Sequence, residues 1–82
     1  MNVILSKDAE KQYKKLPKSE QTKIRKKLTL LSHNPQIGKK LGGELAGRRS
    51  LRAWPYRIIY LINETANQVQ ISDILHRQGA YK

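Results

Sequence analysis

The chain has no cysteine and no phenylalanine, and only 6 of its 82 residues are acidic. Without cysteine it can form neither disulfides nor thiolate metal sites. Its two histidines are isolated and no carboxylate cluster accompanies them, so the usual ligand spacing of a zinc site is absent. We therefore expect a protein that uses no metal ion and no cofactor.

Long hydrophobic runs are missing as well. The apolar stretch near the N-terminus consists of Val3, Ile4 and Leu5, which is too short for a signal-peptide core, and no segment reaches the length of a membrane span. The basic segments also lack the Trp and Phe anchors of helices that lie on membranes. We expect a cytoplasmic protein without membrane contact, folded as a single domain over residues 1–82.

The charge of the chain is strongly one-sided. Lys and Arg number 17 against 6 Asp and Glu, which gives a net charge of +11. Such an excess attracts polyanions over a long range, so nucleic acid is the leading class of partner. The alternative is a merely soluble charged surface, although such surfaces usually mix both signs.

The N-terminal half has the pattern of a strand followed by two helices. Ser6 is a good N-cap for the first helix, which Pro17 ends. Ser19 is the expected cap of the second helix, which Asn34 and the proline after it stop. The apolar positions at helical spacing are Ala9, Tyr13 and Leu16, then Ile24, Leu28 and Leu31.

The C-terminal half changes to the alternating pattern of strands. A glycine-rich connection leads to residues 48–54, where alternation predicts a half-buried strand with Arg48, Ser50 and Arg52 on its exposed face. Residues 56–62 form a nearly continuous apolar run, typical of a central strand, and a last strand follows with a bulge near Asp73. We expect an α+β fold of order β-α-α-β-β-β, in which an N-terminal helical hairpin covers one face of an antiparallel sheet.

Cationic and proton-transferring residues gather in this second half. The arginine fork binds phosphate oxygens in a bidentate manner, so Arg48 and Arg52 are either phosphate ligands or charges that protect an edge strand. Arg57 interrupts an apolar strand, where a charge is costly, and we expect it to be functional or paired with Asp73. The full set is Arg48, Arg52, Arg57, His76, Arg77 and Tyr81.

Metal-free RNA cleavage needs a group that removes a proton from a 2′-hydroxyl and one that protonates the leaving 5′-oxygen. His76 and Tyr81 are the candidates for these roles. As structural alternatives, His76 is a hydrogen-bonded loop residue and Tyr81 packs over the sheet. Basic residues of the second helix, Lys23, Lys26 and Lys27, either bind RNA or form a solvated helix face.

Two segments resemble the signature of RelE/ParE superfamily toxins: LRAWPYRIIY at 51–60 and DILHRQGAY at 73–81. The stop at Asn34 and the stretch GKKL at 38–41 also match, so the resemblance covers nearly the whole chain. It implies the fold expected above. In RelE-type members it further implies a toxin that enters the ribosomal A site and cuts mRNA by 2′-hydroxyl attack, leaving a cyclic phosphate.

The resemblance also implies residue roles. Arg57 is similar to the arginine that stabilises the transition state, Arg77 to a second phosphate-binding arginine, and Tyr81 to a tyrosine that stacks on a base or assists proton transfer. His76 is similar to the histidine that several members place before that arginine. Arg48 stands at the position of one catalytic lysine, and a serine replaces a second lysine, so we assign the general base to His76 or Tyr81.

The partners implied are a cognate antitoxin, the ribosome and mRNA, with a toxin–antitoxin hetero-oligomer that binds operator DNA. Two other functions stay open. One is a ParE-like inhibitor that binds DNA gyrase without hydrolysis, and the other is a non-catalytic RNA-binding module whose lysines make the contacts. The joint presence of Arg57, His76, Arg77 and Tyr81 favours the endoribonuclease, because a pure binding protein does not require proton carriers beside phosphate ligands.

Overall fold

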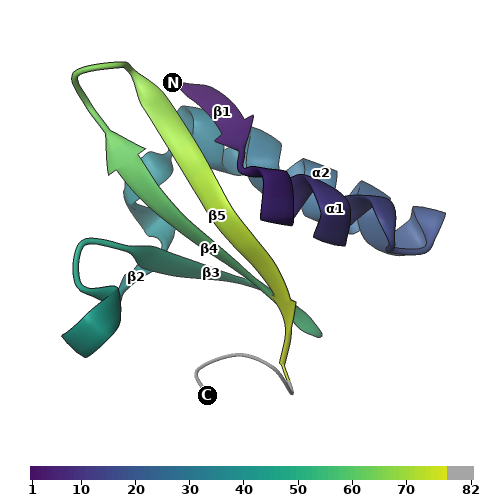
Figure 1. Cartoon of the computed structure of the whole chain (residues 1–82). Helices are drawn as coiled ribbons and strands as arrows, with labels where there is room; N and C mark the ends of the chain where they lie inside the picture. Colours follow the sequence, from purple (N-terminus) through teal and green to yellow (C-terminus); the bar gives the residue numbers. More distant parts are fainter. Residues whose placement is uncertain (78–82) are drawn as a thin grey trace.

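The computed structural model describes residues 1–77, in which two helices lie on one side of a sheet (Figure 1). The sheet has 5 strands in the order β1-β5-β4-β3-β2. Its elements, with two short 3-10 helices, are β1 (Asn2–Leu5), α1 (Lys7–Lys14), α2 (Lys18–His33), η1 (Pro35–Ile37), β2 (Lys39–Lys40), η2 (Gly43–Leu45), β3 (Arg49–Ala53), β4 (Tyr56–Asn63) and β5 (Gln68–His76). The expected α+β order is confirmed, and β2 is an additional strand.

The expectation of a wholly antiparallel sheet is wrong at one edge. The pairs β2–β3, β3–β4 and β4–β5 are antiparallel. β1, however, runs parallel to β5, with Val3 opposite Val69 and Leu5 opposite Ile71. Parallel neighbours require a long crossover connection, and the whole chain between β1 and β5, both helices included, supplies it.

The helix boundaries follow the local signals with one exception. Ser6 caps α1, because its Oγ accepts a hydrogen bond of 3.0 Å from the backbone N–H of Ala9. α2 ends at Asn34 as expected. The expected cap at Ser19 is wrong: α2 begins after Pro17, which makes no side-chain cap hydrogen bond. Proline is pre-organised for a helix start, so the residue that ends α1 also opens α2.

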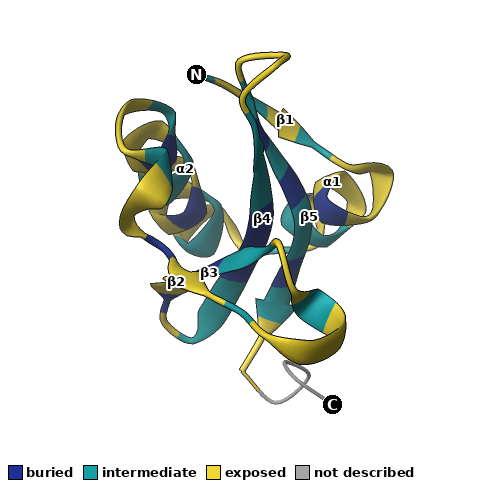
Figure 2. Cartoon of the chain, turned by 90° about the vertical axis from the view of Figure 1, so that its left-hand side faces the viewer, coloured by how far each residue is buried: buried dark blue, intermediate teal, exposed yellow. Residues whose placement is uncertain are grey.

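One hydrophobic core joins the helices to one face of the sheet. Figure 2 shows its buried residues on β4, β5, α1 and α2. In β4 the alternation directs Ile58 and Tyr60 into this core, while Ile59 points to the other face and is also buried. The core residues are Ala9, Ile24, Leu31, Ala53, Ile58, Tyr60, Val69, Ile71 and Ile74.

The second sheet face is less open than the alternation predicts. Ser50, expected on an exposed strand face, is only 6% exposed. The expectation fails there because β2 pairs with the outer side of β3, placing Lys39 opposite Ser50, and Ile59 lies opposite it on β4. Ser50 is therefore inside the sheet, whereas Arg52, beyond the reach of β2, is exposed as expected.

The expected bulge in the last strand is confirmed. Ile59 lies opposite Asp73 and Tyr60 opposite Ile71, so Ser72 is the extra residue of β5. This shift lets Ile71 and Ile74, which are three positions apart, both reach the core.

Past the end of β1, α1 covers the outer edge of β5. The side chain of Gln12 accepts a hydrogen bond of 2.7 Å from the backbone N–H of Ile74 and donates one of 3.3 Å to the Asp73 carboxylate. The Gln12 side chain thus bonds a backbone N–H of β5 at a point where no neighbouring strand pairs with it.

Tyr60 connects the sheet to the segment that leaves the helices. Its ring is fully buried, and its hydroxyl donates a hydrogen bond of 2.7 Å to the Pro35 carbonyl and accepts one of 2.8 Å from the Gly38 N–H. Arg49 adds a hydrogen bond of 3.1 Å to the Gly38 carbonyl. Burial raises the pKa of Tyr60, and the Gly38 N–H and the charge of Arg49 oppose that rise.

Because Tyr60 packs closely on Gly38, a larger residue at position 38 should destabilise the protein. In Gly38→Ala the new Cβ would lie 2.7 Å from Cε1 of Tyr60, so we expect a loss of about 1–3 kcal/mol in the free energy of unfolding. Gly42→Ala is the matched control, because no atom lies within 4 Å of its Cβ position. Urea unfolding measures both variants, and equal losses would contradict the close approach at Gly38.

The raised pKa of Tyr60 predicts a stability loss at alkaline pH. The folded state keeps the phenol proton at a pH where the unfolded chain, with an ordinary tyrosine pKa of about 10, loses it. The contribution is complete below about pH 10 and is lost as the pH rises through the folded pKa. Urea unfolding over a pH series should show a shallower alkaline decline in Tyr60→Phe than in wild type. Identical slopes in the two proteins would refute this account.

Candidate functional site

Two arginines face each other across β3 and β4, on the side of the sheet turned away from the core. Arg52 lies directly opposite Arg57, and Leu75 lies opposite Arg57 on β5. The neighbours Ala53 and Ile58 point into the core, so alternation directs both arginines to the other face. Arg52 is exposed and Arg57 half-buried. Like charges in facing positions repel each other, and an anion between them offsets that repulsion.

Arg77 joins this end of the sheet. Its backbone N–H donates a hydrogen bond of 2.8 Å to the carbonyl of Pro55, in the turn between β3 and β4. Its guanidinium lies over the Trp54 ring, 5.0 Å from the ring centroid. A cation over an indole is held by the negative ring face. Arg52, Arg57 and Arg77, which we call the arginine end, therefore lie around the same turn.

His76 belongs to the opposite sheet face from Arg57. It pairs in register with Tyr56, and the two rings meet edge to face with centroids 5.5 Å apart. Tyr56 packs against the core, so His76 lies on the side of the helices although its own side chain is exposed. Of the cationic and proton-transferring residues in the second half of the sequence, Arg52 and Arg57 thus share one face of the sheet, and His76 lies on the other. Tyr81 lies outside the described residues.

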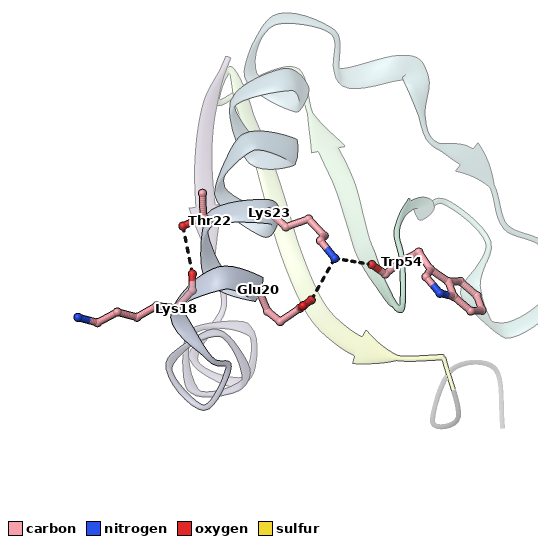
Figure 3. A network of polar contacts seen from close by, with 5 residues as sticks. All are labelled: Lys18, Glu20, Thr22, Lys23 and Trp54. Carbon is pink, nitrogen blue, oxygen red and sulfur yellow. Dashed lines mark hydrogen bonds and ion pairs between the residues drawn. The ribbon is translucent and has the colours of Figure 1, made fainter.

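Lys23 is engaged in a contact that sequence reasoning missed. Its Nζ donates a hydrogen bond of 3.0 Å to the Trp54 carbonyl and forms an ion pair of 3.4 Å with Glu20 (Figure 3). This contact attaches α2 to the β3–β4 turn. Lys26 is exposed and Lys27 half-buried on the same helix. RNA binding by Lys23, Lys26 and Lys27 stays a prediction. Lys23 also has a structural role, because it joins α2 to the β3–β4 turn.

Arg48 lies at the other end of β3, about four residues or ~13 Å from Arg52. It lines a concavity of about 660 Å³ between β2, the start of β3 and the far end of β4. The residues around it are Gln36, Lys40, Leu41, Gly47, Arg48, Arg49, Leu61, Ile62, Asn63, Glu64 and Thr65. This hollow is therefore separate from the arginine end.

Asp73, the alternative partner predicted for Arg57, forms a hydrogen bond with Gln12. In register Asp73 faces Ile59, two positions from the level of Arg57. Ser50 is buried, and its hydroxyl has no hydrogen-bond partner among residues 1–77. Within the same residues no group of three metal-ligating side chains comes together, and no helix is long and apolar enough to cross a membrane.

Comparisons with known proteins agree with this architecture. A family model described as the ParE toxin of the type II toxin–antitoxin system matches residues 3–81. Toxin RelE of Mycobacterium tuberculosis is 34% identical over 53 residues, which cover 65% of this chain and 55% of that protein. The chain thus aligns with about half the length of this curated relative.

Solved structures extend the likeness over most of the chain. The toxin–antitoxin complex RelBE2 from Mycobacterium tuberculosis contains a chain with a TM-score of 0.85 and 32% identity, covering 93% of this chain and 96% of that one. The archaeal RelE–RelB complex from Pyrococcus horikoshii gives a TM-score of 0.78 at 24% identity, covering 96% and 97%. At that lower identity the likeness concerns the fold alone.

The arginine end predicts a defined polyanion site. Arg52→Ala and Arg57→Ala should each weaken binding of a single-stranded RNA oligonucleotide and lower the slope of log affinity against log salt by about 0.7. Fluorescence anisotropy over a salt series measures both quantities. Arg25→Ala removes the same charge from α2, where Arg25 bonds the Tyr13 hydroxyl, and serves as the control. A slope lowered equally by all three variants would contradict a localised site.

Proposed function

This chain belongs to the RelE/ParE superfamily of toxins from type II toxin–antitoxin systems, and on that premise we propose that it cleaves mRNA on the ribosome without a metal ion. The observation that supports this proposal best is the facing pair of Arg52 and Arg57. Two guanidinium groups at facing positions suit the oxygens of one phosphate, and Arg77 at the end of β5 adds a third cation nearby.

The proposed reaction is a transesterification within the RNA. The 2′-oxygen attacks the adjacent phosphorus, the bond from phosphorus to the 5′-oxygen breaks, and a 2′,3′-cyclic phosphate and a 5′-hydroxyl result. Charge accumulates on the phosphoryl oxygens during this step. Arg57, with Arg52 and Arg77 beside it, would stabilise that charge, because fixed cations lower the energy of a developing anion more than that of the ground state.

Two proton transfers accompany the reaction. A base takes the proton of the 2′-hydroxyl and an acid protonates the departing 5′-oxygen. His76 and Tyr81 are our candidates. We propose that one of them is the base and the other the acid. His76 packs against Tyr56 on the face opposite Arg57, so RNA held by Arg57 would pass around the end of β5 to reach it.

The proposal includes two kinds of partner. Several similar structures are toxin–antitoxin complexes, and we propose a cognate antitoxin for this chain as well. The second partner is the ribosome, whose RNA would attract the basic face of α2 through Lys26 and Lys27. Arg48 and the hollow that it lines would contact the substrate further along its backbone. A toxin–antitoxin complex that binds operator DNA and a cytoplasmic location complete the proposal.

A ParE-like inhibitor of DNA gyrase is the second candidate, because the matching family model carries the ParE description. It would bind its target without proton transfer, so loss of Tyr81 would have little effect on inhibition.

Induction in growing cells separates the two functions. Mapped mRNA 5′ ends should show new cuts that depend on translation, and Arg57→Ala should reduce them about 100- to 1000-fold. Tyr81→Phe should also reduce them, whereas Arg25→Ala should cut like wild type. Intact mRNA together with blocked gyrase supercoiling would refute the ribonuclease and support the ParE-like alternative.

A further inference from the structure

Trp54 is the single tryptophan of the chain and lies in the turn between β3 and β4. It is 54% exposed, more than Ile4, Leu30 or Ile37, the other exposed large hydrophobic residues of the described part. One exposed apolar side chain is ordinary on a protein surface. Trp54 differs from the other three residues in the contacts that hold it and in the charges around it.

Three contacts, one from α2 and two from the end of β5, hold Trp54 and the residue after it. α2 reaches its backbone carbonyl through the Nζ of Lys23 at 3.0 Å (Figure 3). The end of β5 holds the next residue, because the Arg77 N–H donates to the Pro55 carbonyl at 2.8 Å. The Arg77 guanidinium then lies against the ring, 5.0 Å from its centroid. A flat aromatic surface held by its neighbours loses little conformational entropy when a ligand stacks on it.

The surroundings of the ring are cationic. Arg52 precedes Trp54 by two residues, Arg57 lies opposite Arg52, and Arg77 lies against the ring itself. The nearby carboxylate of Glu20 is paired with Lys23. An aromatic ring among phosphate-binding cations is the arrangement with which proteins hold single-stranded nucleic acid, the bases stacking while the cations hold the backbone.

We propose that the Trp54 indole is a stacking platform for an unpaired base of single-stranded RNA, next to the phosphate held by Arg52 and Arg57. The inference deepens the proposed function and depends on it for the identity of the substrate. Trp54 takes no part in proton transfer; it positions the RNA. Within residues 1–77 a polypeptide partner is less suited to this place, because the other exposed large apolar residues there, Ile4, Leu30 and Ile37, lie on different elements and do not extend the indole into a wider apolar surface.

Because the chain has one tryptophan, its fluorescence reports on this position alone. The probe is a short single-stranded oligoribonucleotide with 2′-O-methyl sugars, which cannot be cleaved by 2′-hydroxyl attack. We expect it to quench Trp54 on binding. The same backbone with abasic sites, and inorganic phosphate, should leave the emission almost unchanged, because they offer charge without a base to stack. Equal quenching by the abasic strand would overturn the proposal.

Substitutions give the second readout. Trp54→Ala should bind the labelled oligonucleotide roughly 5- to 150-fold more weakly, and Trp54→Phe should retain most of the affinity. Leu30→Ala, which removes another exposed apolar side chain from α2, is the matched control and should bind like wild type. Circular dichroism checks that each variant is folded. If Trp54→Ala binds like wild type, the platform does not exist.

The outcomes also separate this inference from the proposed function. Base-dependent quenching by the uncleavable strand in a protein that cuts no mRNA would overturn the ribonuclease and leave the stacking site intact. Cleavage at the wild-type rate in Trp54→Ala, together with no quenching of the wild-type protein by the uncleavable strand, would overturn the stacking site alone. A change of emission with a bound protein partner but not with RNA would overturn it in favour of a protein contact.

Discussion

The buried hydroxyl of Tyr60 is the interaction on which the arrangement of the molecule depends. It binds the Pro35 carbonyl and the Gly38 N–H, which fixes the segment that leaves α2 against the middle of β4. The burial of the Tyr60 side chain also decides which residues of β4 point into the core. Once Tyr60 and Ile58 point into the core, Arg57 must lie on the opposite face, where Arg52 faces it. The buried side chains of Ile58 and Tyr60 thus determine the face on which the cations are displayed.

The cationic end of the sheet combines two facing positive charges with exposed apolar surface. Two facing arginines repel each other, and a half-exposed tryptophan leaves apolar surface in water. Under the proposed function, RNA would supply phosphates for the arginines and bases for the indole. The backbone around them is held firmly by Lys23 from α2 and by the Arg77 N–H from the end of β5. The site therefore belongs to a rigid frame rather than to a free loop.

Local patterns predicted what depends on local chemistry. Ser6, Asn34 and the bulge beside Asp73 follow from capping and periodicity, and they were found where expected. The parallel pairing of β1, the contact of Gln12 with Ile74 and that of Lys23 with Trp54 join residues far apart in sequence, which periodicity does not reveal.

The sheet face on which His76 lies could be predicted from the sequence only in part. The bulge places His76 in phase with the buried Ile74, so its separation from Arg57 could have been inferred from the sequence once the bulge was placed. The roles proposed for Arg57, Arg77 and Tyr81 depend on family resemblance, because sequence patterns alone supply only their residue types and spacing.

The chemistry of the RNA ends tests the central claim most directly. Purified translating ribosomes are incubated with the protein, and the termini of the mRNA fragments are identified. The account predicts a 2′,3′-cyclic phosphate on the upstream fragment and a 5′-hydroxyl on the downstream one, both lost in Arg57→Ala. Fragments that carry a 3′-hydroxyl and a 5′-phosphate would contradict 2′-hydroxyl attack at the arginine end.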